Sequence, residues 1–149
     1  MKLKYFWNTL IGLTALLLAS LSSAEIYTGF FSEKAVGGYD TVAYFTDGKP
    51  KKGKKKYKVE YMEATWYFSS AKNKELFEAD PEKYAPQYGG HCAWAVGANS
   101  AKAPGNPKFW KIVDDKLYLN YNGDVQQKWF KDIPGFIKSA DKNWPEIAE

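Results

Sequence analysis

The organising stretch of this chain lies at residues 84–96, which read YAPQYGGHCAWAV. It holds the chain's only cysteine, Cys92, and its only histidine, His91, directly after two glycines. Because glycine lacks a Cβ atom, another backbone segment or a ligand can approach closely there. A thiol beside an imidazole is the most chemically capable pair in the sequence, so this stretch is our first candidate for a functional site.

The backbone after the glycines can be read in two ways. Cys92, Trp94 and Val96 alternate as the residues of a strand do, whereas Cys92 and Val96 also fit one face of a helix. The scarcity of β-branched residues favours a helix over residues 92–98. A helix beginning here would favour a thiolate at Cys92 through the partial positive charge of its N-terminus.

The first residues of the chain predict export. Lys2 and Lys4 precede an apolar run over residues 10–21, and small residues follow. This order is typical of a signal peptide, here residues 1–24. An uncleaved membrane anchor is the alternative, but the run is shorter than the about 20 residues that span a bilayer. We expect a periplasmic or secreted mature chain, residues 25–149, without a stable membrane anchor.

The composition of the mature chain suits a single domain with its own core. Residues 1–24 hold two lysines and no acid, so their removal lowers the formal net charge from +4 to about +2. Aromatic residues make up 17% of the full chain, and each can bury a large area. Some aromatic residues could instead line a ligand pocket: Tyr39, Tyr44, Tyr61, Trp66, Tyr88, Trp94 and Trp110.

Seven lysines fall within residues 49–58, where Pro50 and Gly53 interrupt regular structure. We interpret this segment as a solvated loop between strands. The alternative is a binding surface for an anionic partner, such as a membrane surface. The chain contains no arginine, which argues against a nucleic-acid partner because base and phosphate contacts favour arginine.

The remaining patterns predict an α+β fold: a small antiparallel sheet or hairpins with short helices packed on it. We recognise no internal repeat. We expect strands over residues 39–45, 57–62, 65–68, 109–113 and 117–121. We expect helices after Ser69 or Ser70 up to Ala79, from Asp80 to Pro86, over residues 123–130, and from Asp132 to Pro145.

Several of these segments resemble the YHS domain family. They are GYDTVAYF at residues 38–45, TWYFSS at 65–70, FEADPEKY at 77–84 and PQYGGHCA at 86–93. The last segment, together with residues 117–121 and 143–145, is similar to exported proteins that contain such a domain. The resemblance implies a family-like core over about residues 36–98 and a C-terminal extension, a hairpin followed by helices, over about residues 99–149.

The resemblance also implies metal binding through cysteines, because related short domains occur beside copper-transporting ATPases and in some oxygenases. Those domains carry their cysteines at two places, where this chain has residues 41–43 (TVA) and 69–70 (SS). The usual metal cysteines are therefore absent. His91 departs from the exported proteins as well, since the resemblance implies an aromatic residue such as tyrosine there.

The remaining candidate ligands are few. A structural zinc site needs about four ligands, and only Cys92 and His91 qualify. Copper(I) accepts fewer and softer ligands, so we take Cys92, His91 and Met62 as the candidate metal ligands. Nucleophilic catalysis by Cys92 would need a base and an orienting group, for which Asp40 and Asp80 are the available carboxylates.

We therefore expect an exported, non-enzymatic YHS-type binding domain that takes a soft metal ion, such as copper, or a small ligand around Cys92. The first alternative is a thiol-redox protein that uses Cys92. The second is a structural or interaction domain in which Cys92 is simply buried. No catalytic or cofactor-binding residue is assigned.

Overall fold

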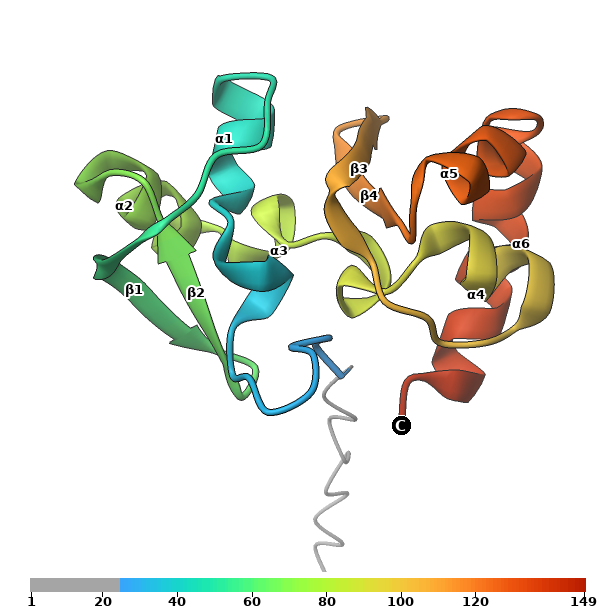
Figure 1. Cartoon of the computed structure of the whole chain (residues 1–149), viewed down its shortest axis with the longest axis horizontal. Coiled ribbons are helices and arrows are strands. Elements are labelled where there is room, and N and C mark those ends of the chain that lie inside the picture. The colour runs from blue at the N-terminus through green and yellow to red at the C-terminus, as the bar shows by residue number, and fades with distance from the viewer. Residues whose placement is uncertain (1–24) are drawn as a thin grey trace, which may run out of the picture.

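The computed structural model describes residues 25–149, and the expected signal peptide lies outside the described residues. Two halves of similar make-up lie side by side (Figure 1). The first half runs through η1 (Ala35–Gly38), α1 (Thr41–Thr46), β1 (Lys54–Tyr61), β2 (Ala64–Phe68), α2 (Ala71–Ala79) and α3 (Pro81–Tyr84). The second runs through η2 (Gln87–Gly90), α4 (Ala93–Asn99), β3 (Asn106–Val113), β4 (Lys116–Asn120), α5 (Gly123–Phe130) and α6 (Ile133–Ile147).

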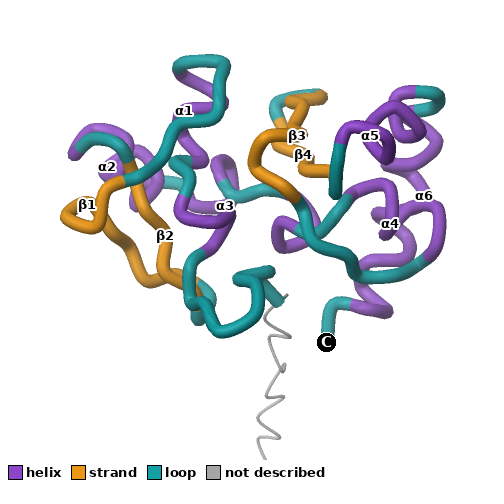
Figure 2. The backbone as a smooth tube through the Cα atoms, viewed as in Figure 1, coloured by secondary structure: helices purple, strands orange, loops and turns teal. Residues whose placement is uncertain are grey.

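Each half contains one antiparallel hairpin, β1–β2 or β3–β4, and the two hairpins are separate two-stranded sheets (Figure 2). Short helices pack around them, which confirms the expected α+β class. Within residues 25–149, no helix has both the length and the apolar character needed to cross a bilayer.

The two halves are copies of one structural unit, displaced by 52 residues along the chain. Strands β1 and β3 begin and end 52 residues apart, and so do β2 and β4. Both first strands are irregular at the same place, between Lys54 and Lys58 in one copy and between Asn106 and Trp110 in the other. The two hairpin turns have matching positive φ angles, 50° and 59° at Met62-Glu63, 50° and 60° at Asp114-Asp115.

The backbone segment that precedes the first α-helix of each copy also has the same conformation. Three successive residues have positive φ angles in each: Val36, Gly37 and Gly38 at 51°, 59° and 82°, then Tyr88, Gly89 and Gly90 at 57°, 61° and 84°. A backbone hydrogen bond then fixes the residue before the first helix. Asp40 N–H donates to the Lys51 carbonyl at 2.8 Å, and Cys92 N–H donates to the Ala103 carbonyl at 2.8 Å.

The expectation that the chain has no internal repeat is therefore wrong. The sequence hides the repeat because only six of the 52 position pairs from 35/87 to 86/138 are identical. One of them is Gly53 with Gly105, where a Cβ atom would collide with the backbone of Tyr67 and of Gly90, respectively. The glycine that this backbone position requires is the same in both copies, whereas most side chains that pack the cores differ. The boundary that we expected between residues 98 and 99 falls in the last turn of α4 (Ala93–Asn99), inside the second copy.

Strand β4 lies between the two hydrophobic cores. Leu117 and Leu119 pack into the core of the first copy, around Trp66 and Phe77, whereas the intervening Tyr118 packs with Trp129 in the second. This follows from the two-residue alternation of a strand, which sends successive side chains to opposite faces. The two copies therefore share apolar contacts across β4.

Residues 39–45 were expected to form a strand, and this is wrong. Asp40 instead caps α1, since its side chain accepts a hydrogen bond from Ala43 N–H. Val42, Ala43 and Tyr44 are all buried, so the apolar run shows no periodicity that separates a helix from a strand.

We expected a loop over residues 49–58. This is wrong for residues 54–58, because β1 begins at Lys54 and pairs with β2. The connection also lies one residue earlier than expected. Met62 and Glu63 form the turn, and Ala64 is the first residue of β2. Met62 is thus a turn residue and not a strand residue.

Helix α6 does not end before Pro145 but continues to Ile147. The proline ring nitrogen removes one intrahelical hydrogen bond. Ile147 packs against the second core, Ala148 is buried, and Ala148 N–H donates to the Trp144 carbonyl at 2.9 Å. Packing therefore holds the last turn in place. The other expected elements, including the helix after Cys92, are confirmed with shifts of up to three residues.

Candidate functional site

Cys92 is the residue before α4, in the same position as Asp40 before α1. The side chain is 0% exposed, and its Sγ lies 3.6 Å from Asn120 Oδ1. The same oxygen accepts a hydrogen bond from Trp94 N–H at 3.3 Å. Burial raises the pKa of the Cys92 thiol, and weaker opposing contributions come from backbone N–H groups around it. The expected thiolate is therefore disfavoured, because desolvation outweighs the helix N-terminus.

His91 is 3% exposed and lies between two aromatic rings. The ring centroids of Tyr27 and Trp144 are each 5.4 Å from the imidazole centroid. Its Nδ1 lies 2.9 Å from the Tyr88 carbonyl oxygen. Burial lowers the pKa of His91, so the ring is neutral at physiological pH, and Nδ1 carries the proton because a carbonyl oxygen can only accept. The Nδ1–H group of His91 thus makes a structural hydrogen bond.

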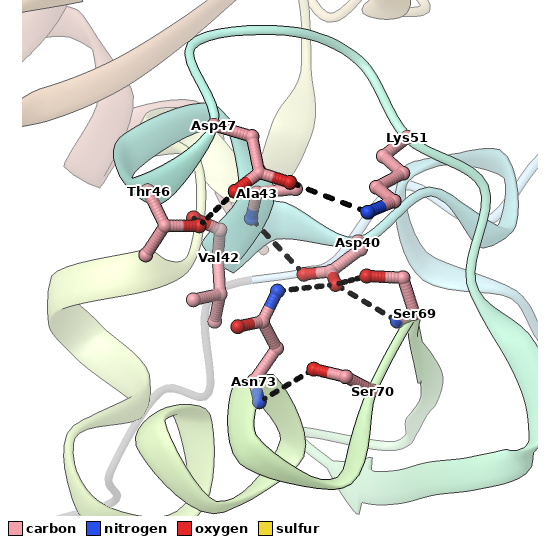
Figure 3. A network of polar contacts seen from close by, with 9 residues as sticks. All are labelled: Asp40, Val42, Ala43, Thr46, Asp47, Lys51, Ser69, Ser70 and Asn73. Atoms are coloured by element: carbon pink, nitrogen blue, oxygen red, sulfur yellow. Dashed lines mark hydrogen bonds and ion pairs between the residues drawn. The ribbon is translucent and has the colours of Figure 1, made fainter.

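Asp40 does not orient a histidine. Its carboxylate is 0% exposed and bonds to three residues (Figure 3). Oδ1 accepts from Ala43 N–H at 3.1 Å. Oδ2 accepts from Ser69 N–H at 2.8 Å, from Ser69 Oγ–H at 2.6 Å and from Asn73 Nδ2–H at 2.8 Å. The residue joins α1 to the β2–α2 corner. Asp80, the other carboxylate considered, caps α3 through Lys83 N–H.

This network brings together the two places at which the resemblance implies metal cysteines. Ala43 lies at one side of Asp40 and Ser69 at the other (Figure 3). Soft metal ions prefer thiolates and thioethers. Serine hydroxyls and a carboxylate with four hydrogen bonds do not fit such an ion, so this corner has a structural role in this chain.

Met62 lies in the first hairpin turn, whereas the other two expected ligands, Cys92 and His91, are buried. It lines an open groove whose walls include neither Cys92 nor His91. Among residues 25–149, no three His, Cys, Asp or Glu side chains are placed to hold a metal ion. Copper binding by Cys92, His91 and Met62 stays a prediction, because methionine is not among these four residue types.

The groove lies where the two copies meet the N-terminal segment, and its volume is about 590 Å³. Aromatic and other apolar side chains form most of its walls: Ile26, Tyr61, Met62, Ala85, Pro86, Tyr88, Trp144 and Pro145. Glu82, Gln87, Lys116 and Asp141 add polar groups. Tyr88 OH donates to Asp141 Oδ1 at 2.8 Å, and burial together with this bond raises the pKa of Tyr88, so the phenol stays protonated.

Sequence reasoning found part of this groove. Tyr61 and Tyr88 line it as expected, whereas Tyr44 and Trp66 are core residues. Trp144 was missed as a groove residue. Only the assembly of both copies places α6 beside the first hairpin turn, so no local pattern could have identified it.

Residues 42–88 match the family model of the YHS domain. The match covers most of the first copy and ends where the second begins. The chain is thus a protein that contains a YHS domain. No curated protein and no solved structure matches it.

Proposed function

We propose that the protein is an exported, non-catalytic binding protein that takes a small ligand in the groove between its two copies. The groove carries this proposal. Its volume of about 590 Å³ lies within the usual range of small-molecule sites, about 300–1,000 Å³, but two other hollows of the described chain are at least as large. The lining by eight aromatic or other apolar side chains is therefore the main support. The groove combines apolar walls with a few polar groups, the composition by which such sites give both affinity and orientation.

The state of Cys92 and His91 supports a non-catalytic role. A nucleophilic thiol needs access and a lowered pKa, whereas Cys92 is buried and its thiol pKa is raised. A general base needs an unprotonated ring nitrogen in reach of its substrate. Nε2 of His91 is unprotonated when Nδ1 donates to the Tyr88 carbonyl, but the side chain is 3% exposed, so a substrate has no access to it. The thiol-redox alternative would require this region to open.

Replacing Met62 by aspartate is expected to weaken binding of an amphiphilic probe, 1-anilinonaphthalene-8-sulfonate, by about tenfold. The change removes an apolar wall residue, a loss of about 1.5 kcal/mol or more, and adds a charge that repels the sulfonate. The fold accepts the change because Asp114 holds the matching turn position with the same φ of 50°. Fluorescence titration of the mature protein measures the affinity.

The matched control is Asp114→Asn, which alters the equivalent turn outside the groove and should leave probe affinity unchanged. Equal probe affinity in Met62→Asp and the unmodified protein would refute the groove as the site. Copper(I) titration tests the alternative in parallel, since binding that Cys92→Ser abolishes and Met62→Asp spares would favour a soft-metal site at Cys92.

We also predict that the protein is exported and that its signal peptide is removed. The mature protein should be recovered from the periplasm or medium with Glu25 as its first residue, because residues 1–24 have the order of a signal peptide. Cell fractionation followed by N-terminal sequencing measures this. Recovery of a chain that still begins at Met1 in the membrane fraction would contradict it.

A further inference from the structure

The first hairpin carries a positive charge that its fold does not require. Residues 47–63 contain seven lysines and three acids. The equivalent residues of the second copy, 99–115, contain three lysines and two acids, yet they build the same strand, irregularity and turn. The second hairpin thus shows that this backbone forms without the lysine cluster.

The lysines of β1 are available to a partner. Lys54, Lys55, Lys56 and Lys58 are all exposed. Lys51, before the strand, pairs with Asp47 at 3.4 Å, but the four strand lysines form no ion pair with any residue of the described part. The mature chain outside residues 47–63 holds 12 lysines and 14 acids, so this hairpin is the positive region of a chain that is otherwise slightly acidic.

Two fully exposed phenylalanines adjoin this charged hairpin. Phe30 and Phe31 are 95% and 108% exposed, with ring centroids 6.4 Å apart. The segment that follows them pairs with β2, since Thr65 N–H donates to the Glu33 carbonyl at 2.7 Å. Phe31 and Tyr67 line one open hollow, and Tyr67 is the cross-strand partner of Lys58. Phe31, Tyr67 and Lys58 therefore lie on one surface of this hairpin.

We propose that β1 and the Phe30-Phe31 pair form a peripheral binding site for an anionic phospholipid bilayer. Lysines near an anionic bilayer gain affinity from its surface potential, and each contributes about fivefold. Aromatic side chains insert at the level of the headgroups, where their apolar rings leave water. A soluble polyanion offers no apolar layer for the phenylalanines. The absence of arginine fits attraction by point charges, without bidentate phosphate recognition.

Vesicle sedimentation of the mature protein tests the proposal. We expect binding to vesicles of phosphatidylglycerol and phosphatidylcholine, little binding to phosphatidylcholine alone, and weaker binding as salt rises. Changing Lys54, Lys55, Lys56 and Lys58 to serine should lower affinity for the anionic vesicles on the order of 100-fold or more. The charge-matched control replaces four exposed lysines elsewhere by serine, Lys72, Lys131, Lys138 and Lys142, and should retain most binding.

A second variant separates a bilayer from a polyanion. Phe30→Ser with Phe31→Ser should weaken vesicle binding while leaving heparin binding unchanged. The proposal is overturned if the unmodified protein fails to bind anionic vesicles, if the β1 variant binds as well as the charge-matched control, or if the phenylalanine variant binds vesicles normally. Melting curves of all variants confirm folding, which the exposure of these side chains predicts to be intact.

Discussion

Replacing Asp40 by alanine is expected to lower the free energy of unfolding by about 3–5 kcal/mol. The carboxylate is fully buried and accepts four hydrogen bonds, from Ala43, Ser69 and Asn73. Its loss removes the cap of α1, worth about 0.5–2 kcal/mol, and leaves the buried Asn73 amide without an acceptor at about 1–3 kcal/mol. The two Ser69 donors are only partly buried, so losing their acceptor adds less. Equilibrium denaturation in urea measures the change.

The control is Asp47→Ala. Asp47 pairs with Lys51 at 3.4 Å at the surface, where an ion pair contributes about 0–1 kcal/mol. Domains of this size are stable by about 5–15 kcal/mol, so the Asp40 variant should be measurably destabilised or partly unfolded at room temperature. Equal effects of the two changes would show that the buried network does not hold α1 to α2.

The comparison of the copies explains why Asp40 and Cys92 differ. The residues that match Ser69 and Asn73, both donors to Asp40, are Tyr121 and Val125. The second copy therefore lacks the serine hydroxyl and the asparagine amide that bind the carboxylate in the first. A smaller and neutral thiol fits this setting, with Asn120 Oδ1 at 3.6 Å. Cys92 thus occupies the equivalent helix-capping position in a less polar environment.

Local signals in the sequence were sufficient where one side chain determines one backbone feature. Ser70, one of the two serines expected before α2, caps that helix, and Asp80 and Asp132 cap the helices that we expected to begin there. A short polar side chain before a helix satisfies its free N–H groups. The alternation before Met62 and the strand-forming residues after Ala64 likewise predicted the first hairpin. These features depend on neighbours in the sequence.

Features that depend on distant residues could not be predicted in this way. Four successive residues of α1, Thr41 to Tyr44, are buried, so its apolar run carries no helical period. The groove combines the turn at Met62 with Trp144, 82 positions further along the chain. The raised pKa of the Cys92 thiol follows from burial that only the packed structure supplies, which is why the helix N-terminus alone suggested the opposite.

The thiol of Cys92 is expected to react at least about 1,000-fold more slowly in the folded protein than in the denatured chain. The side chain is 0% exposed within a core position, so a reagent reaches it only when the structure opens. Opening of a core position approaches global unfolding, whose equilibrium constant is about 10³ or more against the open state. Burial also raises the pKa of the thiol, which lowers the fraction of reactive thiolate.

The most direct test of a structural Cys92, with binding elsewhere, is the rate of labelling by a thiol-specific disulfide reagent at neutral pH. The measurement compares metal-free folded protein with the same protein in guanidinium chloride, and Cys92→Ser supplies the blank. We predict slow labelling in the folded state, with a rate that rises as denaturant populates the unfolded chain. Labelling of the folded protein at the rate of the denatured chain would contradict the account and return Cys92 to the centre of function.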